Sequence, residues 1–265
     1  KKNKNLPKVL DLTSPNISIS ILFDDFYEND YLYYIYKNFN HLNKTCIDIG
    51  ANIGNHSLFF SNYFEKVFSI EPSSYNFAIL KLNTENIKNI NIINCGCSEF
   101  NRKAKLYNNY KSGASNSLNL PTFEELKKRN REDELNIKRQ YEIVELKTID
   151  ELFFEKENNI DLIKIDAEGE EFNCLKGGVK TIKKNKPIIL FEEWNVVNGC
   201  SETINYLKDL KYDIFSFEKK HQKNLSNTLI FRFFKKIFFS KNNFILKEIT
   251  SQTGGYECLV AVPTK

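Results

Sequence analysis

The chain has 265 residues, which is enough for one large domain or for two small ones. Its 38 basic and 34 acidic residues leave a net charge of +4, well short of the basic surface typical of nucleic-acid-binding proteins. No apolar run reaches the roughly 18 residues of a membrane span, and the six cysteines form no C-x-x-C pair. We therefore expect a soluble, cytoplasmic protein without a transmembrane segment and with reduced thiols.

The first 44 residues are expected to form an N-terminal cover. A short strand is predicted at Ile17–Phe23, and a helix with an aromatic stripe at Asp24–Phe39. Residues 45–265 are expected to form the main domain, with inserts near 107–140 and 219–255.

The stretch that organises the chain is Thr45–Pro72, which predicts a strand, a glycine turn, a helix and a second strand. Gly50 and Gly54 lack a Cβ, so the backbone can bend sharply and a ligand can approach it closely. Asn52 tolerates a left-handed backbone, and the helix that follows directs its free N–H groups towards the turn. The turn therefore predicts a site for an anionic group.

Two acids flank this turn and narrow the choice of ligand. Glu71 comes about twenty residues later, where such units hold a ribose diol. Asp48 precedes the turn, where a carboxylate can accept from an ammonium group. Asn52 stands where a pyrophosphate-binding turn needs its second glycine, which argues against a dinucleotide. The pattern favours S-adenosylmethionine over a nicotinamide cofactor, and the remaining interpretation is a tight turn with no ligand.

A helix is predicted at Ser74–Asn86 and a third strand at Ile90–Cys95. Strands that alternate with helices form a parallel sheet, and ligands lie at the carboxyl ends of its strands. Cys97 and Ser98 follow the third strand, so we expect them on the same edge as Gly50 and Glu71, beside an adenine.

The next segment interrupts this rhythm. A charged helix is predicted within residues 121–140, and its charges are typical of a solvated face. The loop Gly113–Ser117 is rich in small and hydroxyl residues, and it is interpreted either as a substrate lid or as an inert connection.

Strands return at Tyr141–Leu146, Ile160–Ile165 and Pro187–Phe191, with helices between and after them. Acids follow two of these strands, namely Asp166, Glu168, Glu170 and Glu171 after the second, and Glu192 and Glu193 after the third. The strand Tyr212–Phe217 is predicted to pair with the last apolar run, Tyr256–Val262. The basic and aromatic segment 219–255 between them is interpreted as a folded insertion rather than as a binding surface for nucleic acid or an anionic glycan.

With these pieces in order, the chain resembles the FkbM family of S-adenosylmethionine-dependent methyltransferases. The resemblance rests on these segments: Tyr27-Glu28, DIGANIGNHS (48–57), Glu71-Pro72, VELKTIDEL (144–152), DLIKIDAEGEEFNCLKGG (161–178), KPIILFEEW (186–194) and CLVAVP (258–263). It implies a class I methyltransferase fold, which is an α/β, Rossmann-like, seven-stranded and mostly parallel sheet with an antiparallel C-terminal strand and helices on both faces. It also implies O-methylation of a sugar hydroxyl in a glycan or natural-product precursor.

Carried over by position, the resemblance assigns Asp48, Gly50, Asn52 and Gly54 to the methionine part, Glu71 to the ribose, and Ser98 with its neighbours to the adenine. Ala51, Pro72 and Cys97 complete this expected set. The inserts 121–140 and 219–255 depart from the family pattern, so they leave the substrate and its choice of hydroxyl open.

Methyl transfer to a hydroxyl requires alignment and a base that removes the proton. Asp166 is the first candidate for this base, Glu168 the second and His56 the third. The alternative use of the clustered acids is a Mg²⁺ site formed by Asp166, Glu168 and Glu193, since oxygen ligands suit this ion.

Two other functions compete with this one. A ribose 2′-hydroxyl RNA methyltransferase needs the same oxygen and base, although acids at the site repel phosphates. A non-catalytic nucleoside-binding module would keep the fold without the chemistry. The oligomeric state is not predicted.

Overall fold

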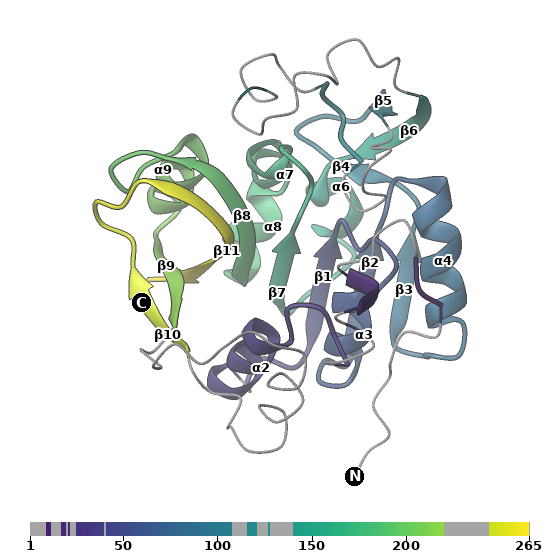
Figure 1. The fold of residues 1–265 in the computed structure, drawn as a ribbon, viewed down its shortest axis with the longest axis horizontal. Helices are drawn as coiled ribbons and strands as arrows, with labels where there is room; N and C mark the ends of the chain where they lie inside the picture. Colours follow the sequence, from purple (N-terminus) through teal and green to yellow (C-terminus); the bar gives the residue numbers. More distant parts are fainter. Residues whose placement is uncertain are drawn as a thin grey trace.

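The computed structural model describes residues 9–11, 17–19, 21, 25–39, 41–107, 116–120, 127, 140–219 and 244–264. Its main sheet has eight strands (Figure 1). Their order is β10 (Phe244–Glu248), β9 (Tyr212–Lys219), β11 (Gly254–Pro263), β8 (Ile188–Val196), β7 (Ile160–Ile165), β1 (Thr45–Ile49), β2 (Lys66–Ile70) and β3 (Ile90–Ile93).

Neighbouring strands from β3 to β8 are parallel, and β11 is antiparallel to both β8 and β9. The mostly parallel sheet with an antiparallel C-terminal strand is therefore confirmed, as is the pairing of β9 with the last apolar run. The expected number of strands was wrong by one, because β10 pairs with the outer edge of β9. Its short run FILKE lies inside the segment that was interpreted as an insertion.

Helices cover both faces of the sheet, as expected, because the strands alternate two apolar sets. One set packs with α6 (Ile149–Phe153), α7 (Glu171–Gly177), α8 (Val179–Asn185) and α9 (Glu202–Asp209). The other set includes Cys46, Leu162 and Leu190, and it packs with α2 (Asn29–Asn38) and α3 (Asn55–Ser61).

The period of two along a strand fixes which polar residues share that second face. Asp48, Lys164 and Glu192 each stand two residues after an apolar residue of the second set. They therefore point towards α2 and α3, at the end of the sheet where β1 and β7 finish. Parallel sheets bind ligands at this end, where connections leave neighbouring strands in opposite directions.

A second, small sheet was not predicted. Its order is β4 (Gly96–Cys97), β6 (Tyr141–Lys147) and β5 (Arg102–Tyr107), and it lies at the top of Figure 1. The helix α4 (Ser74–Thr84) connects β2 to β3. The predicted cap of α6 is present, since Thr148 accepts from the backbone N–H of Glu151.

The N-terminal prediction needs one correction. Residues 17–19 and 21 are helical rather than extended. Ile17 and Ile21 stand four residues apart, so a helix also places them on one side, where they pack with Ile53 and Ile79. Within the described part of the chain, no helix is long and apolar enough to cross a membrane.

Candidate active site

The glycine turn after β1 has the tight conformation that the sequence predicts. Gly50, Asn52 and Gly54 all have positive φ angles, of 75°, 51° and 97°. A Cβ added to Gly50 would lie 1.7 Å from the carbonyl oxygen of Asp166, because the turn crosses directly over the end of β7. The backbone N–H groups of Gly50 and Ala51 both donate to Ile70, which ties the turn to β2.

Glu71 at the end of β2 closes the same turn from the other side. Its two carboxylate oxygens accept from the backbone N–H groups of Asn52 (2.8 Å) and Ser73 (2.9 Å). Burial raises the pKa of Glu71 to about 7, and these hydrogen bonds oppose the rise. A carboxylate held in this way keeps lone pairs for further donors.

The first of two adjoining hollows, which we call the turn hollow, has a volume of about 630 Å³. Five of the residues predicted to bind the cofactor line it, namely Gly50, Asn52, Glu71, Pro72 and Cys97. The unpredicted small sheet adds apolar walls through Leu106 and Leu146, and Leu118 adds another.

The other residues predicted to bind the cofactor do not line the turn hollow. Ala51 and Gly54 shape the turn without lining the hollow, and Asp48 is completely buried. Ser98 is also buried, and its hydroxyl donates to the carboxylate of Glu170 at 2.9 Å. Asp48 and Ser98 are thus held by protein partners rather than presented to a ligand.

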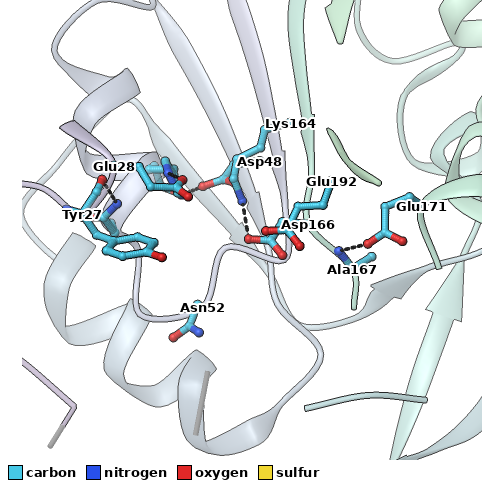
Figure 2. Close-up of polar contacts among 12 residues, drawn as sticks. Tyr27, Glu28, Asp48, Asn52, Lys164, Asp166, Ala167, Glu171 and Glu192 are labelled. Carbon is cyan, nitrogen blue, oxygen red and sulfur yellow. Dashed lines mark hydrogen bonds and ion pairs between the residues drawn. The ribbon is translucent and has the colours of Figure 1, made fainter. Parts of the chain in front are cut away.

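Asp48 belongs to a buried chain of polar contacts (Figure 2). It accepts from the hydroxyl of Ser57 at 2.6 Å, and the ammonium of Lys164 lies 3.6 Å from its other oxygen. Lys164 also donates to Asp166 at 3.0 Å. Burial by itself lowers the pKa of Lys164, but the carboxylates of Asp166 and Asp48 outweigh it and the pKa is raised.

Sequence reasoning missed Lys164, although a signal was present. A lysine inside the apolar strand IDLIKI stands two residues before Asp166, so the two side chains point to the same face.

The second hollow, which we call the acidic hollow, has a volume of about 410 Å³. Its polar lining residues are Glu28, His56, Lys164, Asp166, Glu192 and Glu257, and its apolar ones include Tyr31, Leu32 and Phe191. Among the described residues, Asp166 is the one that lines both hollows. The structure thus brings Asp166 and His56 to the acidic hollow, whereas Glu168 lines the turn hollow.

Glu28 and His56 form a pair across this hollow. Nε2 of His56 lies 3.0 Å from the carboxylate of Glu28. Asn55 fixes this arrangement, since its side chain accepts from the backbone N–H of Tyr27 and donates to the carbonyl of Tyr27. The sequence singled out Tyr27-Glu28 without assigning it this position.

Glu192 lies beside Asp166 in the acidic hollow (Figure 2). Burial raises the pKa of Glu192 to about 9, and the neighbouring carboxylates of Asp166 and Glu168 add to the rise. Glu192 therefore keeps its proton at neutral pH.

The expected Mg²⁺ ligands are not brought together. Glu193 belongs to the opposite face of β8, where it accepts from Ser201 (2.8 Å) and from the backbone N–H of Asn195 (3.2 Å). Within the described ranges, no group of three or more acidic, histidine or cysteine side chains is placed to hold a metal ion. The alternation of side chains along β8 separates Glu193 from Asp166.

The predicted lid loop lies partly outside the described residues, from 113 to 115. Its last residues, Asn116 and Ser117, are described. Asn116 lines the turn hollow, and the hydroxyl of Ser117 donates to the carbonyl of Glu168 at 3.1 Å. This end of the loop is a wall of the turn hollow.

The strand order and the glycine turn at the end of β1 define a class I methyltransferase fold. A family model described as the methyltransferase FkbM domain matches residues 48–214, and the chain belongs to that family. The resemblance drawn from the sequence is thereby confirmed. A search of curated proteins returned no match.

Solved structures with a similar course of the chain include the methyltransferase FkbM from Methylobacillus flagellatus. It has 16% identity and a TM-score of 0.42, and the match covers 96% of this chain but only 56% of that one. An rRNA methylase from Streptococcus thermophilus has 10% identity, coverages of 88% and 95% and a TM-score of 0.42. A putative methyltransferase from Streptococcus mutans, in complex with SAH, has 12% identity, coverages of 87% and 97% and a TM-score of 0.39. Likeness at this level assigns no substrate.

Proposed function

We propose that the chain is an S-adenosylmethionine-dependent O-methyltransferase that acts on a hydroxyl of a sugar, in a glycan or in a natural-product precursor. The observation that carries this proposal is the position of Asp166. It lines both hollows, so a donor in the turn hollow and an acceptor in the acidic hollow would meet at its carboxylate.

The residues of the turn hollow fit the cofactor. Because Gly50 has no side chain, the turn can pass close to the backbone of Asp166, where a Cβ would clash. Glu71 would accept from the ribose hydroxyls, and Cys97, Leu106, Leu118 and Leu146 would provide apolar walls for adenine. When bound, the cofactor supplies a methyl group on a positively charged sulfur and leaves as a neutral thioether.

The chain's own residues would then handle the acceptor proton. As the O–CH₃ bond formed and the S–CH₃ bond broke, the hydroxyl proton would pass to the carboxylate of Asp166. Lys164 holds one oxygen of that carboxylate and leaves the other for the acceptor. On the acceptor side, His56 with Glu28 is the second candidate base, whereas Glu168 does not line the acidic hollow.

The acceptor is proposed to be uncharged at its reactive end. The carboxylates of Glu28, Asp166 and Glu257 line the acidic hollow beside the protonated Glu192, and they repel phosphate groups. The apolar side of a sugar ring fits against Tyr31, Leu32 and Phe191. This lining also speaks against RNA as the acceptor.

We further propose that residues 1–44 cover the acceptor side of the domain 45–265, since Glu28 and α2 line the acidic hollow. A cytoplasmic location agrees with the six cysteines, all of which are free thiols.

Calorimetric titration with S-adenosylhomocysteine and, separately, with NADH tests the cofactor, and both titrations are repeated with Mg²⁺. We expect micromolar binding of the first compound alone, without dependence on Mg²⁺. Transfer of a labelled methyl group is then measured with neutral glycosides and with RNA at rising salt. Transfer to RNA that falls steeply with salt would replace the sugar by RNA as the acceptor.

Asp166→Asn separates chemistry from binding. We expect loss of methyl transfer, with affinity for S-adenosylhomocysteine within about threefold of the unmodified protein. Near-normal transfer by this variant would move the role of base to His56.

A further inference from the structure

The point where the two hollows meet carries more negative than positive charge. Asp166 lines both hollows, Glu168 lies on the side of the turn hollow, and Glu192 on the side of the acidic hollow keeps its proton at neutral pH. Apart from the imidazole of His56, Lys164 has the one basic side chain among the described residues that line the two hollows. Its ammonium is already shared between Asp48 and Asp166. One ammonium therefore faces more carboxylates than it can balance.

This excess charge contributes to the pKa shifts of two other groups. The carboxylates of Asp166 and Glu168 help burial to raise the pKa of Glu192 to about 9, while Trp194 and Lys164 oppose them. Next to Glu28 in the chain, burial and the carboxylates of Glu28, Glu257, Glu192 and Asp166 raise the pKa of Tyr27 to about 12. Burial is the main cause of both shifts, and the neighbouring carboxylates add to each of them.

We propose that Asp166 and Glu192 make the turn hollow select the charge on the cofactor's sulfur, so that it binds the positively charged methyl donor more tightly than the neutral product. This inference rests on the proposed function, because it takes the turn hollow as the cofactor site and Asp166 as the place where the methyl group is transferred.

The physical reason is that the two compounds differ only at the sulfur, in its methyl group and in its charge. S-adenosylmethionine carries a positive sulfonium, whereas S-adenosylhomocysteine has an uncharged thioether with the same ribose, adenine and amino-acid tail. Their common parts contribute equally, so the difference in affinity reports the potential at the sulfur. At the effective dielectric constant of a partly buried site, one nearby carboxylate in excess of the cations is enough to favour a positive ligand.

Calorimetric titration of the full chain with three compounds measures this difference. S-adenosylmethionine and sinefungin, whose amine stands in place of the methylsulfonium, are both cationic at the relevant position, and S-adenosylhomocysteine is not. We expect both cationic compounds to bind about tenfold more tightly than S-adenosylhomocysteine.

The informative variant removes both acids. In Asp166→Asn alone, the loss of the neighbouring charge lowers the pKa of Glu192, and its new carboxylate replaces the lost one in part. The double variant Asp166→Asn/Glu192→Gln should lose most of the preference for the two cationic compounds, since Glu168 is the acid of this group that remains. Glu157→Gln is the matched control, since Glu157 pairs with Lys66 at 2.9 Å and lines neither hollow, and it should keep the full preference.

Proton release provides a second readout that does not depend on absolute affinity. A cation beside Glu192 favours its ionised form, so S-adenosylmethionine should displace a proton near neutral pH and S-adenosylhomocysteine should displace less. Titrations in buffers with different ionisation enthalpies measure this release, and Glu192→Gln should abolish the difference between the two compounds.

The outcomes separate the two proposals. Equal binding of the charged and neutral compounds by the unmodified protein, with equal proton release, overturns the charge selection and leaves the cofactor assignment intact. Absence of binding by all three compounds overturns both. A preference that survives undiminished in the double variant shows that other groups cause it, and the assignment to Asp166 and Glu192 is then wrong.

Discussion

The two hollows on either side of Asp166 are built by different means. The turn hollow is formed by the glycine turn after β1, by Glu71 and Pro72 after β2, and by apolar walls from the small sheet, and its shape depends on the glycine turn. The acidic hollow is formed by side chains that come from α2 and its N-cap, α3, β7, β8 and β11. The first hollow therefore depends on the close approach of two backbone segments, whereas the second depends on acids that distant segments bring together.

The largest expected effect is a loss of stability from a methyl group added to the turn. In Gly50→Ala the new Cβ meets the backbone of Asp166 at a φ of 75°, so we expect a loss of at least about 3 kcal/mol and no cofactor binding. Gly169→Ala is the control, since its φ is 101° but its Cβ meets nothing within 4 Å. It should lose only the cost of a left-handed backbone, about 1–2 kcal/mol. Urea unfolding compares the two, and equal losses would show that the turn does not depend on close approach.

The acidic hollow should instead affect how the free energy of unfolding depends on pH. The pKa of Glu192 rises from its ordinary value of 4.5 in the unfolded chain to about 9 in the folded protein, which therefore holds a proton that the unfolded chain has lost. Stability contributed by this group is full at acid pH and is lost as pH rises towards 9. Between about pH 7 and about pH 9 the loss is at most about 1.4 kcal/mol per pH unit.

Glu192→Gln should flatten this part of the curve. Glu71, with a pKa of about 7, contributes mainly below that interval, so Glu71→Gln should leave the slope above pH 7 unchanged. Urea unfolding across the pH range measures both variants, and an unchanged slope in Glu192→Gln contradicts the prediction.

The two hollows can also be compared by replacing one acid in each of them with its amide. We expect Glu71→Gln to weaken binding of S-adenosylhomocysteine by more than about tenfold, because the amide cannot accept from both the turn and the ribose. Glu257→Gln, in the acidic hollow, should change this affinity by less than about twofold. Unchanged affinity in Glu71→Gln would disprove the ribose assignment.

The smallest effect is expected at Ser98, which lies beside the turn hollow but faces Glu170. Ser98→Ala removes one hydrogen bond to this buried carboxylate and should cost about 1 kcal/mol. Binding of S-adenosylhomocysteine should stay within about twofold. Thr148→Ala is the control for stability, since it removes a helix cap of similar strength and Thr148 lines neither hollow. A tenfold loss of affinity in Ser98→Ala alone would show that Ser98 contacts adenine after all.

The turn hollow was predictable because its main residues are close in sequence. Gly50, Asn52 and Glu71 belong to one strand, turn, helix and strand, and local geometry alone brings them together. The walls from the small sheet were not predictable, since they depend on the pairing of β5 and β6 across a long insert.

The acidic hollow could be predicted only in part. Asp166 and His56 were named, but Glu28 and Glu257 reach the site through the order of strands and the packing of α2, which no local pattern contains. Two errors had a local remedy. Counting residues along β7 and β8 by twos from Leu162 and Leu190 places Lys164 and Glu192 inside the site and Glu193 outside it.

The position of β11 has a consequence for synthesis of the protein. This strand comes last among the strands described here, yet it lies between β8 and β9 and supplies Glu257 and Cys258 to the acidic hollow. During translation, β9 cannot join the parallel strands until residues 254–263 have left the ribosome. The nascent chain can complete its turn hollow long before its acidic hollow, and a product truncated before Gly254 would expose two unpaired strand edges to chaperones and proteases.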